Sequence, residues 1–209
     1  MRFSEEMIIE LREDVCRSMS DFRFVHTAEV EKMAQRIAQI YSPEKIDVLR
    51  AAALLHDITK EFTVEQHVNI LLGGGESVSE LDRLSYKTLH ERTAPYAIKE
   101  KYPEFADSEV LAAVRYHTTG RANMSLCEKI IFLADYIDMS RKFDDCVYLR
   151  NYFWDAKPEN MSESERLIHL DKTLLLAFDM TIKALLDEKS PISIESVEAR
   201  NYLVAELKR

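Results

Sequence analysis

The stretch Ala51-Ala52-Ala53-Leu54-Leu55-His56-Asp57-Ile58-Thr59-Lys60 decides how the rest of the chain is interpreted. An apolar run leads directly into an imidazole and a carboxylate, and a lysine follows about one helical turn later. Charged groups at the end of a buried segment must be paired, hydrogen-bonded or bound to metal. A His-Asp pair arises by chance roughly 0.4 times in a chain of this composition, so the dipeptide could also cap a helix end at the surface.

Length and composition indicate one helical globular domain. A chain of 209 residues with 46% hydrophobic residues can bury a sizeable core. Only 4 Gly and 5 Pro are present, which disfavours a turn-rich β protein. The net charge of −9 argues against nucleic acid as a partner, although a local basic pocket could still take a small phosphate compound.

The cysteines and the first residues indicate a cytoplasmic protein. Cys16, Cys127 and Cys146 show no close pairing, which is typical of reduced thiols. The first six residues include two glutamates where a signal peptide would have its apolar run. No apolar stretch approaches the roughly 20 residues that a bilayer-spanning helix needs, so no membrane partner is expected.

Spacings of three and four between apolar residues predict helices along most of the chain, and no alternating strand is evident. The expected helices begin at capping residues or in apolar runs: after Ser4, at Val25, after Ser42, after Thr63, at Leu89, after Asp107, after Ser125, after Ser162 and after Ser193. The helix after Asp107 is expected to end at Gly120. Residues 76–85 and 143–157 are expected to contain no more than short helices. The predicted fold class is all-α, with residues 1–209 in a single domain.

Six polar residues are expected at inward-facing helix positions or at helix ends beside them: His26, His56, Asp57, His90, His117 and Asp135. Four imidazoles and two carboxylates without thiolates suit Fe, Mn, Co or Zn. The set is too large for one tetrahedral zinc site and suits two ions that share a bridging carboxylate. Any one of these histidines could be an ordinary core residue, but each buried polar group needs a partner, which favours the joint interpretation. His67 and His169 are interpreted as surface or boundary histidines outside the set.

The order His, His-Asp, His, His, Asp resembles the HD-domain metal-dependent phosphohydrolases. The segments Tyr116–Arg121 (YHTTGR), Met124-Ser125 and Leu133–Ile137 (LADYI), followed by Arg141, resemble the YqeK branch, the bacterial symmetrical dinucleoside tetraphosphatases. The resemblance covers roughly residues 24–150; the HTTG and ADYI motifs carry it, and the bare His-Asp pair is not specific. It implies a helical HD-domain bundle with a phosphohydrolase core at about residues 22–150 and a C-terminal helical extension at about residues 160–209.

The resemblance also implies a site and a reaction. Two metal ions would be bound, with iron expected first and Mn, Co or Zn as alternatives. The first ion would be bound by His26, His56, Asp57 and Asp135. The second would be bound by His90 and His117, and Asp57 would bridge the two ions. Asp57 and Lys60 would be catalytic, and the substrate would contact Lys60, His90, Thr118, Thr119, Arg121, Tyr136 and Arg141. A water activated by the metal would cleave diadenosine tetraphosphate (Ap4A) symmetrically into two ADP.

The chain departs from the family pattern at two places. The family usually has Glu-Pro after the ADYI motif, whereas this chain has Asp138-Met139-Ser140, and the shorter acid is expected to weaken a supporting bond there. The match is also weaker over residues 161–209.

Three other functions stay open at the level of the sequence. The chain could hydrolyse a nucleoside mono-, di- or triphosphate, or it could be a non-catalytic sensor that binds metal or nucleotide. It could also be a helical interaction domain with purely structural histidines. The long helix expected over residues 162–186 could cover the core or a partner subunit, so a homodimer is left open.

Overall fold

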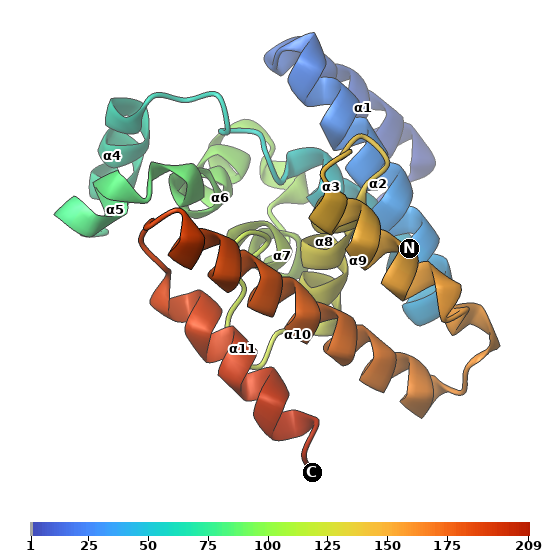
Figure 1. Cartoon of the computed structure of the whole chain (residues 1–209). Coiled ribbons are helices and arrows are strands. Elements are labelled where there is room, and N and C mark those ends of the chain that lie inside the picture. The colour runs from blue at the N-terminus through green and yellow to red at the C-terminus, as the bar shows by residue number, and fades with distance from the viewer. Residues whose placement is uncertain (1) are drawn as a thin grey trace.

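Helices make up all the regular structure in the computed structural model, which describes residues 2–209 (Figure 1). Over that range the chain forms eleven α-helices and four short 3₁₀ turns, without a strand. The all-α prediction is therefore confirmed. None of the helices within residues 2–209 combines the length and the apolar character required to cross a membrane.

The N-terminal part consists of α1 (Glu5–Ser18), α2 (Asp21–Tyr41), a 3₁₀ turn (Pro43–Lys45) and α3 (Ile46–Leu55). As predicted, the side chain of Ser4 caps α1 by accepting from the N–H of Met7. The prediction for α2 was wrong by four residues, because Ser20 caps the helix through the N–H of Arg23 and α2 begins at Asp21. This earlier start places Arg23 on the same helix as His26.

The middle part contains α4 (Val64–Gly73), α5 (Glu80–Leu84), a 3₁₀ turn (Tyr86–Thr88), α6 (Leu89–Lys101), a second turn (Pro103–Phe105), α7 (Ser108–Arg115) and α8 (Leu126–Ile137). The predicted capping boxes at Thr63 and Ser125 are both present. Helix α7 ends at Arg115 instead of Gly120, so His117 lies in the loop that follows it.

The C-terminal part comprises α9 (Asp144–Asp155), a 3₁₀ turn (Pro158–Asn160), α10 (Glu163–Asp187) and α11 (Ile194–Glu206). Residues 143–157 are thus more regular than expected. Helices α10 and α11 form an antiparallel pair, drawn in orange and red in Figure 1, and α10 packs against α8 and α9. The rings of Phe132 on α8 and Phe178 on α10 have their centroids 4.7 Å apart, which joins this pair to the core.

The centre of the core is formed by α2, α3, α7 and α8. All five residues from Ala51 to Leu55 are fully buried, because α3 packs between α2, α7 and α8. The small alanine side chains let the neighbouring helices approach α3 closely. The C-terminal end of α3 therefore lies inside the bundle, and the residues that follow it start from a buried position.

Two histidines outside the predicted set are also buried, so their interpretation as surface or boundary residues was wrong. Nδ1 of His67 lies 2.8 Å from Oγ1 of Thr93, and Nε2 of His169 donates to the carbonyl oxygen of Phe153 at 3.0 Å. A hydrogen bond to one partner allows an imidazole to be buried at little cost.

Candidate metal centre

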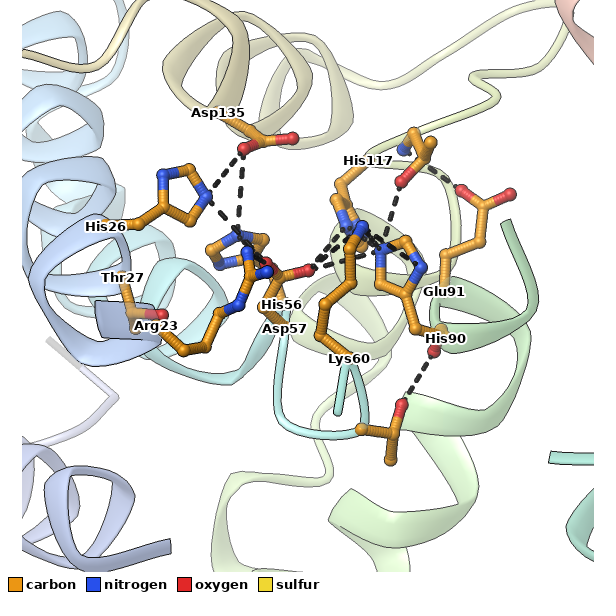
Figure 2. A network of polar contacts seen from close by, with 12 residues as sticks. Arg23, His26, Thr27, His56, Asp57, Lys60, His90, Glu91, His117 and Asp135 are labelled. Carbon is orange, nitrogen blue, oxygen red and sulfur yellow. Dashed lines mark hydrogen bonds and ion pairs between the residues drawn. The ribbon is translucent and has the colours of Figure 1, made fainter. Parts of the chain in front are cut away.

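Five separate segments bring the six predicted polar residues together (Figure 2). His26 comes from the second turn of α2 and Asp135 from the last turn of α8. The other four lie at helix ends: His56 and Asp57 directly after α3, His90 at the second position of α6 and His117 two residues after α7. All six are buried except Asp135, whose side chain is 14% exposed.

The turn after α3 explains how His56 and Asp57 face the interior together. The N–H of Ile58 donates to the carbonyl oxygen of Leu55, and the N–H of Lys60 donates to that of Asp57. These bonds continue the helix as tight turns, so the two adjacent side chains stay at the buried end of α3. His56 is fully buried and Asp57 is 3% exposed.

One group of donor atoms surrounds Oδ2 of Asp57. Nε2 of His26 lies 3.8 Å from this oxygen and Nε2 of His56 lies 3.6 Å from it. On the other side, Oδ1 of Asp135 is 3.0 Å from Nε2 of His26 and 3.8 Å from Nε2 of His56. Nε2 of His26 and Nε2 of His56 thus lie near both carboxylates, and the donors of His26, His56 and Asp57 are close enough to share one cation.

A second group surrounds the other oxygen of the same carboxylate. Oδ1 of Asp57 lies 3.2 Å from Nε2 of His90 and 3.7 Å from Nε2 of His117. The two Nε2 atoms are themselves 2.9 Å apart. Asp57 therefore presents one oxygen to each group, the arrangement that a bridging carboxylate needs.

Two features suit a bound metal ion: the tautomers of the histidines, and several buried donor atoms that make no hydrogen bond within residues 2–209. Nδ1 of His56 is 2.6 Å from the carbonyl oxygen of Ala53, and Nδ1 of His117 is 2.6 Å from that of Val114. Because an N–H at Nδ1 must donate to these carbonyls, the lone pair is left on Nε2, toward the cluster. Within residues 2–209, Nε2 of His26, Nε2 of His56 and Oδ1 of Asp57 are buried without a hydrogen-bond partner. Such atoms are costly to bury unless a ligand satisfies them.

The electrostatics also favour a bound cation. Burial lowers the pKa of His56 to about 4 and that of His90 to about 3, so both rings are neutral at pH 7. Burial opposes protonation of His26 too, but the carboxylates of Asp135 and Asp138 outweigh it and raise the pKa of His26 to about 9. The carboxylates that stabilise a proton on His26 would likewise stabilise a metal cation.

Burial alone would raise the pKa of Asp57, but the interaction with His56, the Lys60 ammonium group and hydrogen bonds from His117 and His90 outweigh it and hold this pKa well below its usual range. The Arg141 guanidinium likewise holds the pKa of Asp135 well below its usual range, although burial alone would raise it. Both carboxylates are therefore ionised and available as metal ligands at neutral pH.

Three cationic side chains adjoin the cluster. Lys60 Nζ lies 3.7 Å from Oδ1 of Asp57 and 3.0 Å from Nε2 of His90. Arg141 Nη2 lies 2.6 Å from Oδ1 of Asp135. Arg23 Nη1 lies 2.8 Å from Oδ2 of Asp57. Arg23 was not among the predicted site residues, because the expected helix began at Val25. Ser20 followed by the acid Asp21 was the available signal, since this pair is typical of a helix start.

The structure brings only some of the predicted substrate-binding residues to the cluster. Thr118 Oγ1 is 3.3 Å from Nε2 of His90. Thr119 Oγ1 instead donates to Glu195. Arg121 forms an ion pair with the buried Glu128, and the hydroxyl of Tyr136 donates to Asp145 at 3.1 Å, so their polar atoms bind other parts of the protein.

Asp138, which stands where the resembled family has Glu, is fully buried behind His26. Its Oδ2 lies 3.3 Å from Nδ1 of His26 and its Oδ1 accepts from the N–H of Ser140 at 2.8 Å. The shorter acid therefore lies within ion-pair distance of the imidazole, but its Oδ2 makes no hydrogen bond within residues 2–209. A carboxylate on the outer nitrogen of a metal-binding histidine fixes the orientation of the ring and raises its basicity.

A cavity of about 410 Å³ lies beside Thr118 and Thr119. One wall is formed by residues 84–88, and the other by Thr181 and Leu185 of α10 and by residues around the start of α11. The volume lies within the range of small-molecule sites, about 300–1,000 Å³.

Comparison with known proteins agrees with this geometry. The family model described as the HD domain matches residues 23–140. The chain is 33% identical to the symmetrical bis(5'-nucleosyl)-tetraphosphatase of Halalkalibacterium halodurans, over 91% of this chain and 93% of that protein. It is 24% identical to the protein of the same description from Bacillus subtilis, over 91% and 94% of the two chains.

A solved structure is similar over almost the whole length. It is described as a predicted HD superfamily hydrolase involved in NAD metabolism from Clostridium acetobutylicum. The TM-score is 0.81 and the identity is 31%, and the match covers 98% of each chain. With the helical fold, the paired His56 and Asp57 and the match over residues 23–140, the chain belongs to the HD domain family.

Proposed function

We propose that the protein is a metal-dependent phosphohydrolase that cleaves Ap4A symmetrically into two ADP. The observation that carries the proposal is the position of Asp57, whose two carboxylate oxygens face two different groups of imidazoles. Relatives of nearly the same length that are described as symmetrical bis(5'-nucleosyl)-tetraphosphatases support the choice of reaction. The net charge of −9 favours a small dinucleotide over nucleic acid as substrate.

Metal ions would be held by two groups that share Asp57. One is His26, His56 and Asp57, with Asp135 beside the two imidazoles, and the other is Asp57, His90 and His117. We expect iron, with Mn, Co or Zn as alternatives, because the donors are nitrogen and oxygen without thiolate. Ions bound here would lower the pKa of a coordinated water and offset the charge of the phosphates.

The side chains around the cluster would bind and orient the tetraphosphate. Lys60, with 29% of its side chain exposed, lies between the buried cluster and solvent and can pair with a phosphate oxygen. The Thr118 hydroxyl can donate to the same chain of phosphates. Asp57 would orient the attacking water. The water oxygen forms a bond to one inner phosphorus, the bond from that phosphorus to the central bridging oxygen breaks, and two ADP result from one Ap4A and one water.

The cavity beside Thr118 supports a nucleotide substrate. It adjoins the cluster through Thr118 and its walls include Leu84, Tyr86 and Leu185, which can pack against a base. We propose that one adenosine of Ap4A binds there. The C-terminal extension, at about residues 160–209, would then contribute to the site that the core, at about residues 22–150, builds.

The test is to load the protein with metal, incubate it with Ap4A and separate the nucleotides. Two ADP for each Ap4A are expected, and ATP with AMP, or no cleavage, would overturn the symmetrical reaction. Asp57→Ala should lose metal and activity together. The control Glu198→Gln, which changes an exposed carboxylate on α11, should keep both. A panel of nucleoside mono-, di- and triphosphates at equal metal loading separates this proposal from hydrolysis of another nucleotide. Tight ADP binding without turnover would instead indicate a sensor.

Two further expectations accompany the proposal. We expect the protein to act in the cytoplasm, which fits three free cysteines. A homodimer that uses the long helix α10 remains a prediction, and light scattering of the purified protein measures it directly.

A further inference from the structure

The segment Thr118-Thr119 is held from the inside by the buried carboxylate of Glu91, which is labelled in Figure 2. Oε2 of Glu91, the residue after His90, accepts from the N–H groups of both Thr118 and Thr119 at 3.0 Å each. Glu91 is only 1% exposed, so these bonds are shielded from water. Because Glu91 and His90 are adjacent on α6, the loop is tied to the helix that supplies part of the candidate metal centre.

The same segment is held from the outside by the first turn of α11. The Ser196 hydroxyl donates to the carbonyl oxygen of Thr119 at 2.9 Å, and the Thr119 hydroxyl donates to Oε2 of Glu195 at 3.0 Å. Ser196 is buried. These bonds join residues almost eighty positions apart, so the C-terminal extension directly restrains a loop of the site.

Arg115 links the inner and outer restraints. Its Nη2 lies 2.8 Å from Oε1 of Glu195, and its Nη1 lies 3.7 Å from Oε1 of Glu91. One guanidinium thereby neutralises two carboxylates that would otherwise repel each other across the loop. Loss of the Glu195 charge would leave Arg115 with Glu91 as its remaining carboxylate partner in this network.

We propose that Glu195 and Ser196 are positioning residues, which set the affinity of the site for the phosphate chain and the adjoining nucleoside. Neither needs to touch the reacting atoms. Ser196 fixes the backbone of Thr119 and Glu195 fixes its side chain. Through Thr119 they restrain the Thr118 hydroxyl, which lies 3.3 Å from His90 Nε2 and borders the cavity. This inference rests on the proposed function, because it names how the extension contributes to binding of that substrate.

The experiment compares Ser196→Ala, Glu195→Gln and the control Glu198→Gln, an exposed carboxylate of the same helix. For each, KM and kcat for Ap4A and the Kd of ADP for the metal-loaded protein are measured, with metal content and the unfolding midpoint. Removing one such hydrogen bond should raise KM and the Kd of ADP about three- to tenfold, with kcat changed less than about twofold. Metal content should stay unchanged, and Glu198→Gln should match the wild type in every measurement.

Three results would overturn the inference. If the wild type cleaves Ap4A and both variants keep its KM and its Kd for ADP, the contacts of Glu195 and Ser196 are only structural. The proposed function is then unaffected. A fall in the unfolding midpoint without a change in KM leads to the same conclusion. If the wild type neither cleaves Ap4A nor binds ADP, the proposed function fails and this inference fails with it.

Discussion

The Nε2 atoms of His90 and His117 lie 2.9 Å apart, and Oδ1 of Asp57 lies 3.2 Å and 3.7 Å from them. Nδ1 of His117 is committed to the carbonyl oxygen of Val114, so its Nε2 carries a lone pair. Two ring nitrogens and a carboxylate oxygen converge at a distance that a shared proton or a shared cation stabilises. This convergence supports the proposed second metal ion.

Removing His117 should remove that ion while the other group keeps its ligands. His117→Ala is expected to lower the metal content from about two ions to about one, and to lower kcat about 1,000-fold, since a catalytic ion supplies several kcal/mol. His169→Gln is the matched control, because His169 is buried outside the cluster. Elemental analysis and ADP formation give both quantities; a variant that retains two ions and full activity would remove His117 from the site.

Asp138 should influence metal binding without contacting the metal. Asp138→Asn keeps the shape of the side chain but weakens its hold on Nδ1 of His26, 3.3 Å away. Metal affinity should fall about 10- to 100-fold, as when other carboxylates behind metal-binding histidines are removed. The exposed Asp155→Asn serves as control. Competition with a chelator of known affinity measures the change, and equal affinities in the two variants would contradict this role.

The sequence predicted the helices whose boundaries are set by local chemistry. The capping boxes at Thr63, Ser125 and Ser162 were evident because their hydrogen bonds span only three residues. The start of α2 was misplaced because Ser20 and the break around it resemble a loop when no tertiary contact is known. The end of α7 was misplaced because Gly120 adopts a left-handed conformation several residues after the helix has ended.

The sequence also predicted part of the candidate site, because local spacing shows which side chains face inward. Inward spacing identifies His26, His117 and Asp135 as polar residues on apolar helix faces, although His117 lies in the loop after α7. Spacing places His90 less securely, and the motif resemblance supports it. Spacing cannot reveal which distant residues meet. The contacts of Arg23 with Asp57 and of Ser196 with Thr119 join residues far apart in the sequence, and only the packed structure brings them together.

Gly120 should be required for the loop that carries Thr118 and Thr119. Its φ of +64° favours glycine, and a Cβ there would lie 2.5 Å from Cζ of Phe178. Gly120→Ala should reduce the free energy of unfolding by about 1–3 kcal/mol, through backbone strain and displacement of a packed ring. The control is Gly73→Ala, since a Cβ at Gly73 meets nothing within 4 Å. Urea unfolding of both variants measures the difference, and equal stabilities would contradict the loop conformation.

The three thiols should differ in reactivity because only one is exposed. Burial, reinforced by nearby carboxylates, raises the pKa of Cys127 and of Cys146 to about 12, whereas Cys16 lies on the surface. The thiolate is the reactive form, so these raised pKa values suppress reaction at any pH well below 12. A disulfide reagent at pH 8 should titrate about one thiol in the folded protein and about three after unfolding. Equal rates for all three in the folded protein would contradict the burial of Cys127 and Cys146.

The central claim is that metal ions held around Asp57 are required for symmetrical cleavage. The most direct measurement removes metal with a chelator, returns Fe²⁺ or Mn²⁺ in steps and follows the nucleotides released from Ap4A. ADP alone should appear, at two for each Ap4A, and its rate of formation should rise with metal and level off near about two ions per chain. Cleavage that is independent of metal, or release of ATP and AMP, would contradict the central claim.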